Sequence, residues 1–193
     1  APHDYSASGN PATYGEDLAI GPSGHVWVYG AFGTETVTFG SFSFSMEPES
    51  YTGAVGNYLG KSPFLVKASP DGAWITGLQG EVEGRIVEPR GMDIGPDGAI
   101  TIAGTNSAES LDFGGLGVTN SGNCQYGSCT SDMFVAQVNS SDLSVNFVRS
   151  FGLDDGYVSG YDVETGPGGE IYLAGTFGTW NGEQEPWTFA GET

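Results

Sequence analysis

The sequence predicts an all-β protein built from repeated units of short antiparallel strands. Three features predict this fold: scattered glycines, alternating strand segments and a recurring turn motif. The 33 glycines lie between short runs of valine, isoleucine, phenylalanine and tyrosine, as expected for many tight turns between many short strands. A hydrophobic fraction of 38%, with 12% aromatic residues, is enough for a packed core and excludes a disordered chain.

The recurring motif is a strand–turn–strand segment that occurs three times, at intervals of about 70 residues. Its copies span residues 17–30, 91–104 and 162–175 and align without gaps. Each copy contains a Gly-Pro-x-Gly turn, in which proline presets φ at the first corner and glycine accepts the positive φ that follows.

The strand after each turn alternates strictly, so its side chains face two sides of a sheet. One face carries Val26, Val28, Ile100, Ile102, Ile171 and Leu173. The other face carries Trp27, Thr101 and Tyr172. A glycine closes each copy, at Gly30, Gly104 and Gly175, and we expect it where a neighbouring backbone approaches closely or the strand bends.

Two further landmarks complete the unit. A phenylalanine recurs as Phe39, Phe113 and Phe189, and a strand pair recurs twice, starting at Phe64 and at Phe134. One unit therefore contains about four antiparallel strands, which is what one blade of a β-propeller requires. A β-sandwich with chance internal similarity is the alternative, and the motifs in register argue against it.

Three segments carry a resemblance to a known family. They are residues 162–177 (DVETGPGGEIYLAGTF), 134–139 (FVAQVN) and 147–152 (FVRSFG). Together they resemble the bacterial SBBP β-propeller repeat, a family of large secreted or surface proteins. The resemblance implies the fold and is nearly silent on function. Residues 76–78 depart from the basic ending of that repeat, and the loop 43–61 is long.

The repeat predicts an incomplete array of about two and a half blades. The expected segments are a tail resembling the end of a blade (1–14), a first blade (15–80), a linker (81–88), a second blade (89–152) and a partial third blade (153–193). Propellers have typically four to eight blades, so we expect exposed strand edges and apolar faces. Completion by the remainder of a longer chain, by a ring of copies, or by head-to-tail strand complementation between copies remains open.

The charge and the cysteines indicate which partners the protein avoids and where it is located. Five Lys and Arg residues stand against 24 Asp and Glu residues, for a formal net charge of −19, which disfavours nucleic acid and anionic membranes as partners. No apolar run is long enough for direct membrane insertion. Cys124 and Cys129 share a loop rich in glycine, serine and asparagine, which predicts a local disulfide and a secreted or cell-surface location. Zinc binding is a poor alternative, because neither histidine lies nearby.

Candidate binding residues are few. Asp154, Asp155 and Asp162 lie in or near a glycine-rich loop and are candidate calcium ligands, the only cofactor the sequence suggests. The aromatic residues Trp180, Trp187 and Tyr126 are candidate platforms for glycan rings, and their alternative role is packing between blades.

We expect no enzymatic activity, because the sequence shows no nucleophile elbow and His25 occupies a position that varies between repeats. The leading hypothesis is a non-catalytic extracellular structural or adhesive module, assembled as a fibre or surface subunit joined head-to-tail by strand complementation. The alternatives are a carbohydrate-binding, lectin-like propeller and a fragment of a larger secreted polysaccharide-active enzyme.

Overall fold

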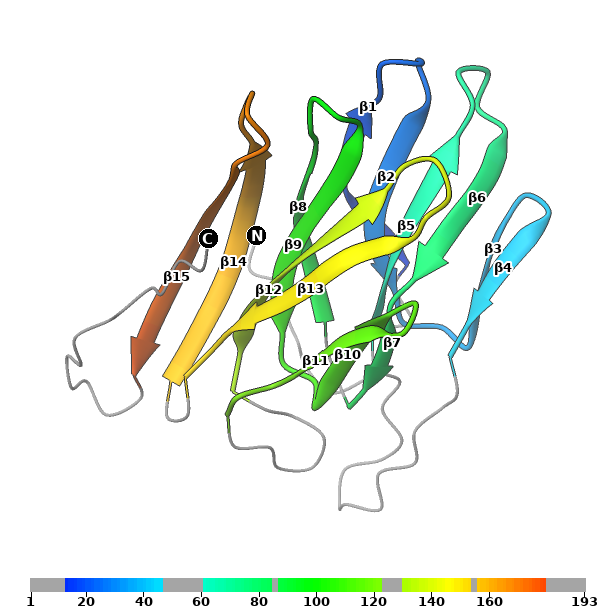
Figure 1. The fold of residues 1–193 in the computed structure, drawn as a ribbon. Helices are drawn as coiled ribbons and strands as arrows, with labels where there is room; N and C mark the ends of the chain where they lie inside the picture. The colour runs from blue at the N-terminus through cyan, green and yellow to red at the C-terminus, as the bar shows by residue number, and fades with distance from the viewer. Residues whose placement is uncertain (1–12, 47–60, 85–86, 123–129, 154–155, 180–193) are drawn as a thin grey trace, which may run out of the picture.

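The all-β prediction is confirmed by a computed structural model (Figure 1). The described part of the chain contains fifteen β-strands and no helix. It therefore contains no helix with the length and apolar character needed to cross a membrane. The described residues are 13–46, 61–84, 87–122, 130–153 and 156–179.

Most of the strands belong to three antiparallel sheets that follow one another along the chain. Sheet 1 has the order β1 (Tyr14–Ile20), β2 (Val26–Phe32), β5 (Ser62–Ala68) and β6 (Trp74–Gln79). Sheet 2 repeats this order with β8 (Val87–Ile94), β9 (Ala99–Asn106), β12 (Asp132–Asn139) and β13 (Val145–Phe151). Sheet 3 contains the described pair β14 (Gly156–Thr165) and β15 (Ile171–Thr179).

Each four-stranded sheet has an additional hairpin between its second and third strands. Hairpin 1 consists of β3 (Thr36–Phe39) and β4 (Phe42–Ser45). Hairpin 2 consists of β10 (Ser110–Phe113) and β11 (Leu116–Thr119). The recurring phenylalanine is thus the last residue of the first hairpin strand in both units, and it is buried in both.

The segment expected as a linker, residues 81–88, connects sheet 1 to sheet 2 and also forms a strand. Its first residues form β7 (Glu81–Glu83), which pairs with β10 and makes hairpin 2 a three-stranded sheet. Its last residues begin β8. In the described part of the chain, β3 of hairpin 1 pairs only with β4.

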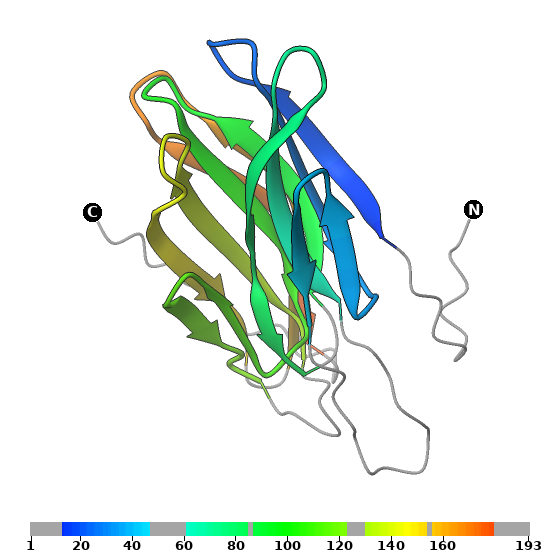
Figure 2. The same ribbon diagram turned by 90° about the vertical axis from the view of Figure 1, so that its right-hand side faces the viewer.

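The three sheets stack face to face in chain order, with sheet 2 in the middle (Figures 1 and 2). Strand β8 contacts β1, β2 and β5 on one side, and β14 contacts β8, β9 and β12 on the other. Within the described residues the stack is open and no sheet closes into a barrel. The arrangement of these sheets as propeller blades stays a prediction.

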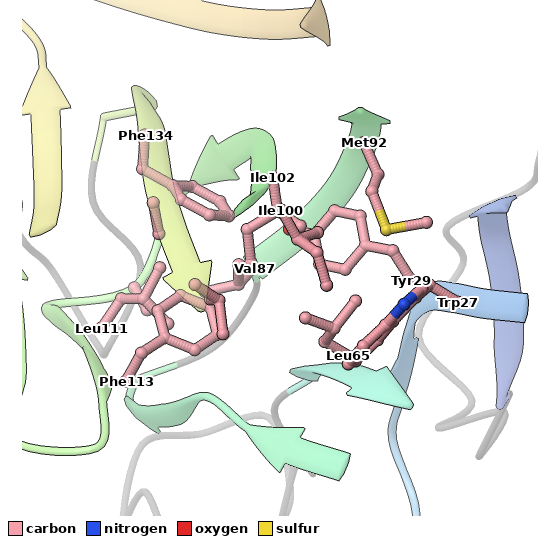
Figure 3. Close-up of a cluster of buried hydrophobic side chains, with 13 residues drawn as sticks. Trp27, Tyr29, Leu65, Val87, Met92, Ile100, Ile102, Leu111, Phe113 and Phe134 are labelled. Atoms are coloured by element: carbon pink, nitrogen blue, oxygen red, sulfur yellow. The ribbon is translucent and has the colours of Figure 1, made fainter. Parts of the chain in front are cut away.

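The main core lies between sheets 1 and 2 (Figure 3). Trp27 and Tyr29 of β2 pack there together with Ile100 and Ile102 of β9, and Phe113 of hairpin 2 belongs to the same cluster. The predicted alternation is confirmed, because Val28 packs against a second cluster on the opposite face of sheet 1. That second cluster is covered by hairpin 1 and contains Phe32, Phe39, Phe44, Phe64 and Val66.

The first strand of every sheet has a β-bulge at the same repeat position. The register shifts between Gly15 and Asp17 in β1, between Pro89 and Met92 in β8, and between Gly160 and Asp162 in β14. The closing glycine lies opposite each bulge. A Cβ atom there would lie 2.1 Å from the Tyr14 oxygen at Gly30, 2.3 Å from the Glu88 oxygen at Gly104 and 2.3 Å from the Ser159 oxygen at Gly175. The close approach expected at these glycines is therefore confirmed.

We predict that Gly104→Ala destabilises the fold by roughly 1–3 kcal/mol, because the added methyl group forces the β8 and β9 backbones apart. Urea unfolding of the variant measures this loss. Gly21→Ala is the matched control, since the nearest atoms to its Cβ would be 3.8 Å away. Equal stability of Gly104→Ala and wild type would contradict the close approach of β8 and β9.

Candidate functional site: the two end faces of the stack

The outward face of sheet 1 is apolar. It is exposed along β1 and half-buried along β2, where Val28 packs against the cluster under hairpin 1. It carries Leu18 and Ile20 of β1, which pair in register with Val28 and Val26 of β2. Leu18 is 61% exposed and Ile20 is 68% exposed. We call these four residues the sheet-1 end face.

The repeat shows what such a face contacts inside the stack. Leu18 occupies the position of Met92 in sheet 2 and of Val163 in sheet 3. Met92 is only 6% exposed and Val163 only 2%, because each packs against the preceding sheet. Ile94, the equivalent of Ile20, is partly buried and packs against the core between sheets 1 and 2. The sheet-1 end face therefore has the side chains of an internal face without a sheet in front of it among the described residues.

The opposite end of the stack is the outward face of sheet 3. Glu164 and Tyr172 are register partners on this face, as are Asp162 and Ala174. Tyr172 is 61% exposed, whereas its repeat equivalent Trp27 is 2% exposed and packs in the core between sheets 1 and 2. Tyr161 lies at the bulge of the same strand and is also exposed. We call Tyr161, Asp162, Glu164 and Tyr172 the sheet-3 end face.

Hydrogen bonds from main-chain N–H groups to carboxylates connect successive sheets. The amide of Met92 in sheet 2 donates to Asp17 Oδ2 of sheet 1 over 2.8 Å. The amide of Thr165 in sheet 3 donates to Asp93 Oδ2 of sheet 2 over 2.7 Å. In both cases the donor lies one repeat position after the carboxylate, so the two interfaces have the same register.

Close contacts at the turns show the same register. A Cβ on Gly21 of sheet 1 would lie 3.8 Å from Ile94 Cδ1, and one on Gly95 of sheet 2 would lie 3.0 Å from Thr165 Cγ2. Gly21 and Gly95 are equivalent in the repeat, as are Ile94 and Thr165. Each sheet therefore stacks on the previous one by the same operation.

The aspartate after the bulge also binds its own strand. Leu18 N donates to Asp17 Oδ1 over 2.8 Å, and Val163 N donates to Asp162 Oδ1 over 2.9 Å. In sheet 2 the equivalent residue is Gly91, which has no carboxylate, and Met92 N uses Asp17 instead. Sequence analysis missed these roles, although Asp17, Asp93 and Asp162 all stand in the aligned repeat.

Charged and aromatic groups at the bulges join sheets 1 and 2. Arg90 forms an ion pair of 2.6 Å with Glu88 and lies 4.0 Å from Glu16 of sheet 1. Burial raises the pKa of the Tyr29 phenol well above its usual value, and Tyr14 and Glu16 raise it further. The Tyr29 side chain is therefore neutral at physiological pH and contributes apolar contact to the core.

Most of the site residues predicted from sequence lie outside the described residues. They are Cys124, Cys129, Asp154, Asp155, Trp180, Trp187 and Tyr126. Their predicted disulfide, calcium and glycan roles stay predictions. Asp162 is described, and it lies on the sheet-3 end face. The parts of the chain that the structure describes contain no group of three or more His, Cys, Asp or Glu residues that could hold a metal ion.

Comparison with protein-family models and with curated sequences identifies no relative. No protein-family model matches the chain, and no curated protein sequence matches it. The resemblance to the SBBP repeat therefore stays a hypothesis, and function has to be argued from the end faces themselves.

We predict that Asp17→Ala lowers the free energy of unfolding by about 1–3 kcal/mol, because it removes the acceptor of the largely buried Met92 amide. Chemical denaturation provides the measurement. The control is Asp142→Ala, whose carboxylate accepts hydrogen bonds from Ser144 in an exposed turn. A loss no larger than that of the control would show that the contact between sheets 1 and 2 does not depend on this hydrogen bond.

Proposed function

We propose that the chain is a non-catalytic structural module of the β-propeller-repeat kind, which assembles head-to-tail with further copies of itself. The observation that carries the proposal is the exposure of Leu18 and Ile20, whose equivalents in the second sheet pack against the preceding sheet. In this assembly, the sheet-3 end face of one copy covers the sheet-1 end face of the next.

The two end faces complement each other as the two sides of an internal interface do. Trp27 of sheet 1 belongs to the same core cluster as Met92 of sheet 2. Tyr172 holds the position of Trp27 on the sheet-3 end face, and Leu18 holds the position of Met92 on the sheet-1 end face. Head-to-tail contact thus places the exposed Tyr172 of one copy against the exposed Leu18 on the sheet-1 end face of the next.

The expected strength of this contact follows from the buried side chains. Burying one large apolar side chain contributes about 1.5–3 kcal/mol, while association costs about 4–15 kcal/mol of lost translational and rotational freedom. Leu18, Ile20 and Tyr172 together offset that cost only at its lower end. We therefore expect reversible association that depends on protein concentration, forming a ring or a fibre according to whether the rotation between copies closes.

An extracellular setting completes the proposal. It is supported by the formal net charge of −19 and by the two cysteines of one short loop. Mutual repulsion of such acidic copies is screened by salt, since the Debye length is only about 8 Å at physiological ionic strength. Assembly in a saline medium is therefore compatible with the charge.

We predict that the average mass of the wild-type chain rises with protein concentration in sedimentation velocity. Leu18→Glu should abolish this rise, because it places a charge on the apolar sheet-1 end face. Leu116→Glu is the matched control, because Leu116 is also an exposed leucine but lies on β11 of hairpin 2. A wild-type chain that stays monomeric over the whole concentration range would overturn the proposed function.

A mixing experiment tests the head-to-tail direction. Leu18→Glu blocks the sheet-1 end face, and Tyr172→Glu blocks the sheet-3 end face. Each variant alone should remain monomeric, and an equimolar mixture should form a dimer through the two intact faces. Association of Tyr172→Glu with itself would show that like faces bind each other and would contradict the head-to-tail arrangement.

A further inference from the structure

Successive sheets approach each other closely at the repeat position of Gly91, beside the bulge of the first strand. Asp17, Gly91 and Asp162 are equivalent in the repeat. A Cβ on Gly91 would lie 2.6 Å from Asp162 Oδ1, 2.7 Å from Val163 N and 2.8 Å from Asp162 Cα. No side chain fits at position 91 without a shift of the main chain of sheet 3.

Each of the two internal interfaces contains one glycine at this position. Between sheets 1 and 2, Asp17 faces Gly91, and its carboxylate crosses to the amide of Met92. Between sheets 2 and 3, Gly91 faces Asp162, and the Asp162 carboxylate binds the amide of its own neighbour Val163. The amide that follows this position thus binds a carboxylate of the preceding sheet, as in Met92, or of its own sheet, as in Val163. In each interface, the second residue at this position is Gly91.

We infer that each end face fits best against a sheet that has glycine at this repeat position. At the junction between wild-type copies, Asp162 of one copy stands against Asp17 of the next, and this contact weakens their association. This inference rests on the proposed head-to-tail assembly and on the register shared by both internal interfaces. At that junction, the Cβ of Asp162 meets the main chain and carboxylate of Asp17, where the internal interfaces have room only because one residue is glycine.

Charge acts in the same direction as shape. Asp162 and Glu164 lie on the sheet-3 end face, and the stacking of Gly91 on Asp162, repeated at the junction, brings Asp162 of one copy against Asp17 of the next, beside Glu16 in the chain. Arg90, which offsets Glu16 between sheets 1 and 2, is already engaged with Glu88 in that internal interface. The junction therefore brings acidic groups together, and this contact sets how tightly copies join.

The inference is tested by comparing self-association of the wild-type chain with that of Asp162→Gly in sedimentation velocity. Replacing Asp162 by glycine gives the junction the arrangement of Gly91 against Asp162. We expect Asp162→Gly to assemble at a concentration at least about tenfold lower than wild type, because relief of an overpacked contact is of this size. Asp162→Asn, which removes the charge and keeps the Cβ, should gain less.

Two further variants separate the possible outcomes. Adding Leu18→Glu to Asp162→Gly should abolish assembly, since it blocks the sheet-1 end face of the next copy. Because Asp162→Gly removes the acceptor of Val163 N, its folding is checked by urea unfolding. Asp17→Gly places the glycine on the other side of the junction and should give the same gain. Because it removes the acceptor of Met92 N, its folding is checked in the same way.

Equal association of wild type and both glycine variants would overturn this inference and leave head-to-tail assembly standing. An equal gain from Asp162→Asn and Asp162→Gly would also overturn it, by showing that charge alone weakens the junction. Absence of association in every variant, including wild type, would instead overturn the proposed function itself.

Discussion

Hydrogen bonds between main-chain amides and carboxylates of neighbouring sheets fix how the whole stack is arranged. Met92 binds Asp17 and Thr165 binds Asp93 with the same offset in the repeat. Asp17 and Met92 border the β-bulges of β1 and β8, and a closing glycine lies opposite each bulge. Apolar packing between sheets is not directional, so the carboxylates supply the register and the buried side chains supply most of the stabilisation.

The strands and their facing were predictable from sequence, because strand alternation and Gly-Pro-x-Gly turns are local signals. The pairing of β7 with β10 was not, since Glu81–Glu83 has only one apolar residue and its partner lies far along the chain. The cross-sheet roles of Asp17 and Asp93 were also missed. An aspartate near a turn has many local uses, and only the stacked sheets show which amide it reaches.

The functional prediction described a kind of surface but did not identify the residues that form it. An open array implied exposed apolar faces. Leu18 and Ile20 are exposed on sheet 1, and Tyr172 is exposed on sheet 3 beside acidic residues. Sequence reasoning instead selected aromatic residues in loops, because exposed loops commonly carry binding sites. Tyr172 gave no such signal, since its position in the repeat is also that of the buried Trp27. Comparing equivalent positions in the three sheets is what distinguishes a core aromatic residue from an end-face one.

The short strand β7 has a consequence for mechanical behaviour. It leaves sheet 1 and forms the edge of hairpin 2, whose Phe113 belongs to the core between sheets 1 and 2. A pulling force on the first unit therefore loads the second unit through this shared strand before sheet 1 has unravelled. Neighbouring units in an extended array would then unfold together under force, because β7 couples them mechanically.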